Sequence, residues 1–410
     1  MKRSRLIILV TLSAVVVMGI ARAVEIQDSP QLLALRSWLA KPEKKRKADA
    51  PVLQIPLSKD EAVVAIQMLS KDRCVHLAGE RRREVEEKSF VVGNKTMRWL
   101  ERTFGKEPSD GHSLWISLHG GGAVPQTVND EQWLNQLRLY QPTEGIYVAP
   151  RAPTDTWNLW HEEHVDVMLN RLIENFVALR CVNPDKVYLM GYSAGGDGVW
   201  QLAPRMADRF AAAAIMAGHP NGASLDGFRN LPFAICMGAD DGAYERNKIA
   251  IQMAAELDTK EQADPRGYIH MSRIYERTGH WMNGKDSEAL PWMEKFKRNA
   301  WPKKIVWVQD DVICERFYWL QIPNKTAVRQ GQKIIAAIDG QDIRLDGEIP
   351  KELTLRLADV LLDLDREVRI TVNSNPAFTV KPVRTMRSIL TSLEGRFDLT
   401  TVATAHVVLP

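Results

Sequence analysis

VYLMGYSAGG, from Val187 to Gly196, is the segment that decides the fold of this chain. Its first four residues are apolar and predict a buried strand, and a helical pattern follows its glycines. GxSxG between a strand and a helix is typical of a sharp turn that exposes the serine at the edge of a sheet. Gly191 and Gly195 are needed because this turn leaves no room for a side chain. A glycine-rich connection with an incidental serine fits the pentapeptide alone, so Ser193 needs partners elsewhere in the chain.

The first partner is His119-Gly120-Gly121-Gly122, which directly follows the apolar run Leu114–Leu118. Glycines at the end of a strand allow backbone N–H groups to point at a substrate oxygen. Gly121 is the expected donor in this segment, and Ala194, the residue after the serine, is the second. We expect His119 to be structural.

An acid and a base follow Ser193 in the chain. The apolar run Phe233–Met237 ends in Gly238-Ala239-Asp240-Asp241, and Asp241 has the spacing expected of an acid after this strand, with Asp240 as the alternative. His280 follows the strand Arg273–Tyr275 on a loop. The chain order Ser193, Asp241, His280 is the order of nucleophile, acid and base in α/β-hydrolases.

The rest of the central region predicts a mainly parallel sheet. Apolar strands alternate with helical patterns, which indicates a sheet covered by helices on both faces. A hairpin around Gly93-Asn94 precedes it. The expected strands are Phe90–Val92, Thr96–Leu100, Leu114–Leu118, Ile146–Ala149, Val187–Met190, Ala211–Met216, Phe233–Met237 and Arg273–Tyr275, and the expected helices are Asp166–Leu179, Gly198–Ala207 and Asn247–Leu257.

The two ends of the chain differ from this region, and 410 residues are too many for one ordinary core. Residues 1–23 have the basic start, apolar run and Ala21-Arg22-Ala23 site of a cleaved signal peptide, which predicts a secreted or periplasmic protein without a membrane span after cleavage. Residues 24–85 are expected to form a helical extension and linker, in which Ser58 begins a helix. Residues 86–301 would form the catalytic domain, and the alternating runs of 302–410 a small β-rich, sandwich-like domain.

The amino-acid composition limits the classes of partner and cofactor that we expect for this protein. A net charge of +3 gives no reason to expect nucleic acid as a partner. The scattered cysteines and the spacing of His161 and His164 give no metal-site pattern, so we expect neither a metal nor a cofactor. Trp157, Trp160 and Trp281 lie beside the candidate catalytic segments, and we expect them to line the substrate site.

Taken together, these motifs make residues 90–300 resemble the esterase and depolymerase branch of the α/β-hydrolases, which includes relatives of polyhydroxybutyrate depolymerases and of feruloyl and acetylxylan esterases. The residues that carry the resemblance are His119 to Gly122, Gly191 to Gly196, Gly238 with Asp241, and Gly279-His280. The chain departs from many relatives at Met237, where they have histidine. The resemblance implies an α/β-hydrolase fold and a Ser-His-Asp triad that cleaves a small-molecule or polymeric carboxylic ester.

Two other functions remain open at this point. A serine peptidase of the prolyl-oligopeptidase type shares the triad and the elbow, although no repeats of a propeller precede the catalytic region. A hydrolase fold that has lost catalysis and binds a partner is the other alternative. The apparently complete triad favours an enzyme.

Overall fold

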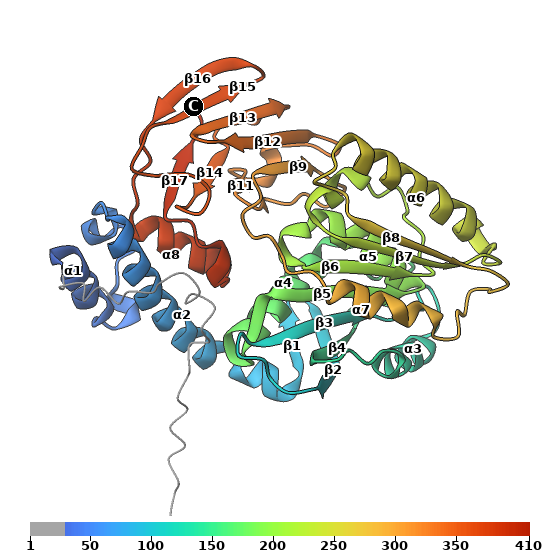
Figure 1. The fold of residues 1–410 in the computed structure, drawn as a ribbon. Helices are drawn as coiled ribbons and strands as arrows, with labels where there is room; N and C mark the ends of the chain where they lie inside the picture. The colour runs from blue at the N-terminus through green and yellow to red at the C-terminus, as the bar shows by residue number, and fades with distance from the viewer. Residues whose placement is uncertain (1–28) are drawn as a thin grey trace, which may run out of the picture.

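The computed structural model describes residues 29–410, and its largest element is an eight-stranded sheet (Figure 1). The strand order is β1-β2-β4-β3-β5-β6-β7-β8. The strands are β1 (Ser89–Val92), β2 (Lys95–Phe104), β3 (His112–Leu118), β4 (Gly145–Arg151), β5 (Val182–Tyr192), β6 (Ala212–Met216), β7 (Phe233–Gly238) and β8 (His270–Tyr275).

The strands β3 to β8 run parallel to their neighbours, whereas the hairpin β1–β2 joins antiparallel to β4. Figure 1 shows α6 on one face of the sheet and α3 and α7 on the other. The helices of this region are α3 (Gln126–Leu139), α4 (Glu163–Leu179), α5 (Ala194–Arg205), α6 (Arg246–Ala263) and α7 (Ala289–Met293). The fold is that of the α/β-hydrolases. Both the sheet and its hairpin are as the sequence predicts.

Burial explains why the central strands read as continuous apolar runs. Every residue of β4, β6 and β7 is buried, because helices cover both faces of these strands. Parallel strands present their carboxyl ends at one edge of the sheet, so the loops after β3, β5, β7 and β8 meet there. The predicted catalytic residues all follow these four strands.

The N-terminal residues form α1 (Pro30–Leu39) and the 29-residue helix α2 (Lys59–Glu87). The expected capping box is present: Ser58 accepts the N–H of Glu61, whose carboxylate accepts the N–H of Ser58. These helices share a hydrophobic core with α8 (Met386–Gly395) from the other end of the chain. This contact joins the N-terminal extension to the C-terminal region, which the sequence predicts as separate units.

The C-terminal region is β-rich, as predicted, and contains two sheets in addition to α8 (Figure 1). One has the order β10-β11-β14-β17 and the other β16-β15-β13-β12-β9. Their strands are β9 (Lys304–Val308), β10 (Arg316–Phe317), β11 (Leu320–Gln321), β12 (Lys333–Asp339), β13 (Asp342–Gly347), β14 (Thr354–Leu357), β15 (Val368–Val372), β16 (Asn375–Val380) and β17 (Ala405–Val408). The hydrophobic core of the large sheet continues into this region without a break.

No helix within residues 29–410 has both the length and the apolar character needed to cross a bilayer. The signal peptide expected over residues 1–23 lies outside the described residues.

Candidate active site

Ser193 lies between the last residue of β5 and the first residue of α5. Its backbone has φ 56° and ψ −121°, a combination that L-residues rarely adopt. A Cβ atom at Gly195 would lie 2.1 Å from the Leu118 carbonyl oxygen, and one at Gly191 would lie 2.3 Å from the Gly195 carbonyl oxygen. The two glycines are therefore required by the close approach of backbone, and the strained turn holds Ser193 at the sheet edge.

Asp241 and His280 meet Ser193 at this edge. The Nδ1 atom of His280 is 2.7 Å from Oδ2 of Asp241, and its Nε2 atom is 3.0 Å from Oγ of Ser193. The carboxylate only accepts, so Nδ1 carries the proton and Nε2 is left to accept the serine proton. The side chain of Asp241 is 2% exposed, whereas that of His280 is 43% exposed. The three residues thus form a hydrogen-bonded chain that runs from a buried acid to an accessible hydroxyl group.

The two adjacent aspartates have different surroundings. Asp240 is exposed, and its backbone N–H donates to the Thr278 carbonyl oxygen over 2.9 Å. Only Asp241 reaches His280. A Cβ atom at Gly238 would lie 2.2 Å from the Gly279 carbonyl oxygen, so glycine at this position lets the acid strand and the histidine loop approach. The geometry favours Asp241 over the alternative left open by the sequence.

The glycine segment after β3 lies against Ser193. A Cβ atom at Gly120 would be 3.2 Å from the Cβ of Ser193. The N–H of Gly122 donates to Oδ1 of Asn129 over 3.0 Å, so it is engaged. Gly121 is exposed, with φ 115°, and Ala194 begins α5, whose first N–H groups have no acceptor within the helix. Gly121 thus belongs to the segment beside Ser193 and Ala194 directly follows it, and the role of their N–H groups as donors stays a prediction.

His119 and Trp160 support this segment from behind. The Nε2 atom of His119 accepts the Ala152 N–H over 3.1 Å, and Nδ1 lies 2.6 Å from the Gly120 carbonyl oxygen. Burial lowers the pKa of His119 to about 4, so the ring is neutral at pH 7. The indole N–H of Trp160 donates to the His119 carbonyl oxygen over 2.9 Å. His119 has the structural position expected of it.

The three tryptophans differ in exposure. Trp157 is 65% exposed and Trp281 53%, whereas Trp160 is fully buried. The prediction that Trp160 lines the substrate site therefore does not fit the structure, because a buried indole offers no surface to a substrate. Trp157 lies beside Gly122 and Trp281 beside Tyr192, with ring centroids 5.5 Å apart in the second case. Two exposed indoles thus remain near the candidate triad.

Asn129 is a site residue that the sequence does not predict. It lies in α3, is fully buried, and its amide donates to the carbonyl oxygens of Gly122 and Val124 and to Asp155. A polar residue in a polar helix gives no signal in the sequence that it faces inward. In the structure it fixes the glycine segment that carries Gly121.

Among residues 29–410, no group of three or more histidine, cysteine, aspartate or glutamate side chains could hold a metal ion. His161 is buried, and its burial lowers its pKa to about 4. His164 pairs instead with Glu162, with 3.3 Å between Nδ1 and Oε2.

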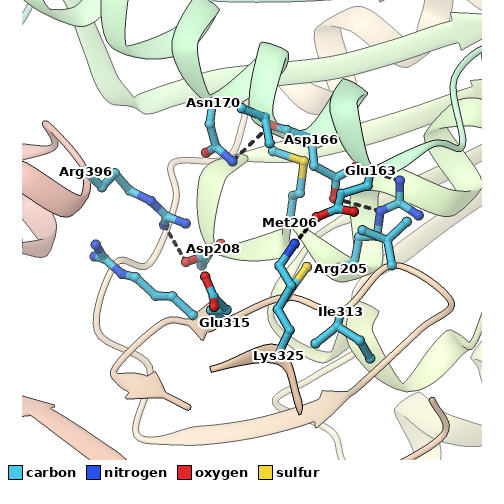
Figure 2. A pocket seen from close by; sticks show the side chains of 14 residues that line it. Glu163, Asp166, Asn170, Arg205, Met206, Asp208, Ile313, Glu315, Lys325 and Arg396 are labelled. Atoms are coloured by element: carbon cyan, nitrogen blue, oxygen red, sulfur yellow. Dashed lines mark hydrogen bonds and ion pairs between the residues drawn. The ribbon is translucent and has the colours of Figure 1, made fainter. Parts of the chain in front are cut away.

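A cavity of about 170 Å³ lies away from the triad, between α4, the end of α5 and the C-terminal region (Figure 2). None of the three candidate catalytic residues lines it. Six of its charged side chains form three ion pairs: Arg205 with Asp166, Arg396 with Asp208, and Lys325 with Glu163. The pairs Arg396–Asp208 and Lys325–Glu163 therefore connect the C-terminal region to the region of the large sheet.

Comparisons with known proteins give structural similarity only. A scan against protein-family models and a search of curated proteins both find no match. Similar solved structures include a thermostable esterase, with 17% identity and a TM-score of 0.40 over 51% of this chain and 62% of its own. A ferulic acid esterase has 16% identity and a TM-score of 0.32 over 49% of this chain and 99% of its own. A Bacillus cereus carboxylesterase has 16% identity and a TM-score of 0.35 over 48% of this chain and 94% of its own.

Proposed function

We propose that this protein is a serine hydrolase that cleaves carboxylic esters through Ser193, His280 and Asp241. The observation that carries the proposal is the continuous hydrogen-bonded chain Asp241–His280–Ser193, with contacts of 2.7 and 3.0 Å. A nucleophile, a base and an orienting acid within hydrogen-bond reach are what acyl transfer requires. The strained elbow at Ser193 supports the same conclusion.

The reaction proceeds in two steps. Oγ of Ser193 attacks the ester carbonyl carbon while Nε2 of His280 takes the hydroxyl proton, and Asp241 stabilises the imidazolium. The N–H groups of Gly121 and Ala194 bind the oxyanion of the tetrahedral intermediate. The intermediate collapses to an acyl-enzyme, and the alcohol leaves with the proton from His280. Water, deprotonated by His280, then attacks the acyl-enzyme and releases the acid and the serine.

The substrate is a small-molecule or polymeric ester. His280 is partly exposed, and the indoles of Trp157 and Trp281 lie open to solvent nearby. Exposed aromatic surfaces beside a reactive serine suit a ligand with apolar or ring-containing groups. The signal peptide that the sequence predicts over residues 1–23 supports a reaction outside the cytoplasm, in the periplasm or the medium.

The test is Ser193→Ala in the full mature chain. We expect hydrolysis of p-nitrophenyl butyrate to fall by at least about 10⁴-fold, because the attacking oxygen is lost. A fluorophosphonate probe should label the wild type and not this variant. The matched control is Ser37→Ala, which removes an exposed hydroxyl on α1 and should leave both readouts unchanged.

Three outcomes separate the alternatives. Full activity in Ser193→Ala would overturn the proposal. Faster cleavage of a peptide p-nitroanilide than of the ester by the wild type would favour a peptidase. A folded wild type that neither hydrolyses esters nor reacts with the probe would favour a binding protein.

A further inference from the structure

The hydroxyl group of Tyr192 bridges two backbone groups of the loop that carries His280. It donates to the His280 carbonyl oxygen over 2.7 Å and accepts the Met282 N–H over 2.9 Å. One hydroxyl can make both bonds because it has a proton to give and lone pairs to receive. The two bonds close the turn whose middle residue is Trp281.

Tyr192 is itself fixed in place. It is the last residue of β5, directly before Ser193, and pairs with Met216 of β6 in the parallel ladder. Its side chain is buried beneath the histidine loop, with its ring 6.0 Å from that of His280. Burial raises the pKa of Tyr192 above its ordinary value, so its hydroxyl keeps its proton at neutral pH and can donate it.

Two further hydrogen bonds hold the loop before His280. The Thr278 carbonyl oxygen accepts the Asp240 N–H, and its Oγ1 accepts from Nζ of Lys285, each over 2.9 Å. Tyr192 holds the loop at His280 and beyond it. Its position next to the nucleophile therefore ties the serine and the base to the same strand end.

We propose that Tyr192 is a positioning residue that holds His280 at hydrogen-bond distance from Ser193. The inference rests on the proposed function. Without the hydroxyl, the His280 carbonyl and the Met282 N–H lose their buried partner, and the loop can move. A displacement of about 1 Å at a reacting group can lower a rate by about 100-fold. Both hydrogen bonds of the Tyr192 hydroxyl go to backbone groups, which leaves none for a substrate. The affinity for the substrate should therefore not change.

The experiment compares Tyr192→Phe with Tyr188→Phe. Tyr188 lies four residues earlier in the same strand, is also buried, and donates its hydroxyl proton to the Phe296 carbonyl oxygen over 2.9 Å. Both variants lose one buried hydroxyl and keep the ring, so both should lower the thermal midpoint. Only Tyr192→Phe should lower kcat on p-nitrophenyl butyrate, by about 10- to 100-fold, with KM within about twofold of the wild type.

Partial unfolding would also lower the measured rate. We therefore measure the rate of labelling by a fluorophosphonate and divide it by the folded fraction, which circular dichroism gives. A kcat for Tyr192→Phe equal to that of Tyr188→Phe would overturn the inference. So would a raised KM with an unchanged kcat, which would place the hydroxyl in substrate binding. An inactive wild type, or activity that survives Ser193→Ala, would count against the proposed function instead.

Discussion

The candidate active site and the junction with the C-terminal region use charge in opposite ways. At the site, the pair Asp241–His280 has one side chain 2% exposed and the other 43% exposed. At the junction, the pair Arg298–Asp398 has side chains 1% and 0% exposed. The guanidinium of Arg298 also reaches Asp185 and the hydroxyl of Thr400. Each charge at the junction therefore has several partners, and the imidazole at the site has two.

The two regions differ in how much stability the protein loses when one charged side chain is removed. A buried ion pair contributes little over an apolar pair, yet removing one member leaves an uncompensated charge in a low dielectric, which costs several kcal/mol. A partly exposed group keeps water as a partner and can be replaced with little effect on folding. Activity should thus be separable from stability at the site, and stability should depend on the junction.

The largest expected effect is that of Asp241→Asn, which tests whether activity and stability are separable at the site. An amide of the same shape no longer fixes the tautomer of His280 or stabilises its imidazolium, so kcat should fall on the order of 10⁴-fold. The thermal midpoint should change little, because the partner His280 is 43% exposed and keeps water as a partner when the carboxylate is lost. Ester hydrolysis and a thermal scan on the same preparation measure both effects.

Asp240→Asn is the matched control for that variant. Its side chain is exposed, and its structural contact is made by the backbone N–H. The substitution should leave kcat within about twofold of the wild type. A large loss in Asp240→Asn and none in Asp241→Asn would reverse the assignment of the acid.

Asp398→Asn tests the other half of the comparison. Burial alone would raise the pKa of Asp398, but Arg298 and Arg209 outweigh it and hold that pKa well below its usual value. The variant leaves both guanidinium groups without this charge. The free energy of unfolding, measured with urea, should fall by about 3–5 kcal/mol, because one partner of a buried pair is lost. Activity per folded molecule should stay near that of the wild type.

Asp342→Asn is the control for this loss, since the pair Arg369–Asp342 is exposed to solvent and should contribute little to the free energy of unfolding. The pH dependence gives a second check. The folded pKa of Asp398 lies below its unfolded value of about 3.9, so its contribution is present above that pH and is lost as the pH falls toward the folded pKa. The difference between wild type and variant should therefore be constant from about pH 5 to pH 8. A difference that vanishes within this range would contradict the assigned role.

Sequence reasoning works at the site because sheet edges leave clear signals. The apolar strands of the sheet and the glycines of the elbow each follow from one local requirement, burial or close approach of backbone. The sequence predicts a later start for the helix after the elbow, at Gly198, whereas α5 begins at Ala194. The difference arises because Gly195 and Gly196 have a low helix propensity, which the elbow overrides.

The junction and the walls of the site leave no such signals. The core that α1 and α2 share with α8 joins residues more than three hundred positions apart, and no periodicity relates them. Arg298 and Asp398 read as ordinary surface residues, because pairing inside the protein depends on the tertiary fold. Trp157 and Trp160 stand three positions apart on one loop, so composition could not separate the exposed indole from the buried one.

The smallest expected effect belongs to Trp281→Ala, which asks how much of the site surface serves the substrate. Its indole is 53% exposed, so its removal should cost less than about 1 kcal/mol of stability. If the indole contacts the substrate, KM for p-nitrophenyl butyrate should rise by about 5- to 10-fold while kcat changes little, because ground-state and transition-state contacts are lost together. Leu33→Ala, which removes an exposed apolar side chain on α1, should leave KM unchanged. A fall in kcat at constant KM would instead place Trp281 with Tyr192 in holding the histidine loop.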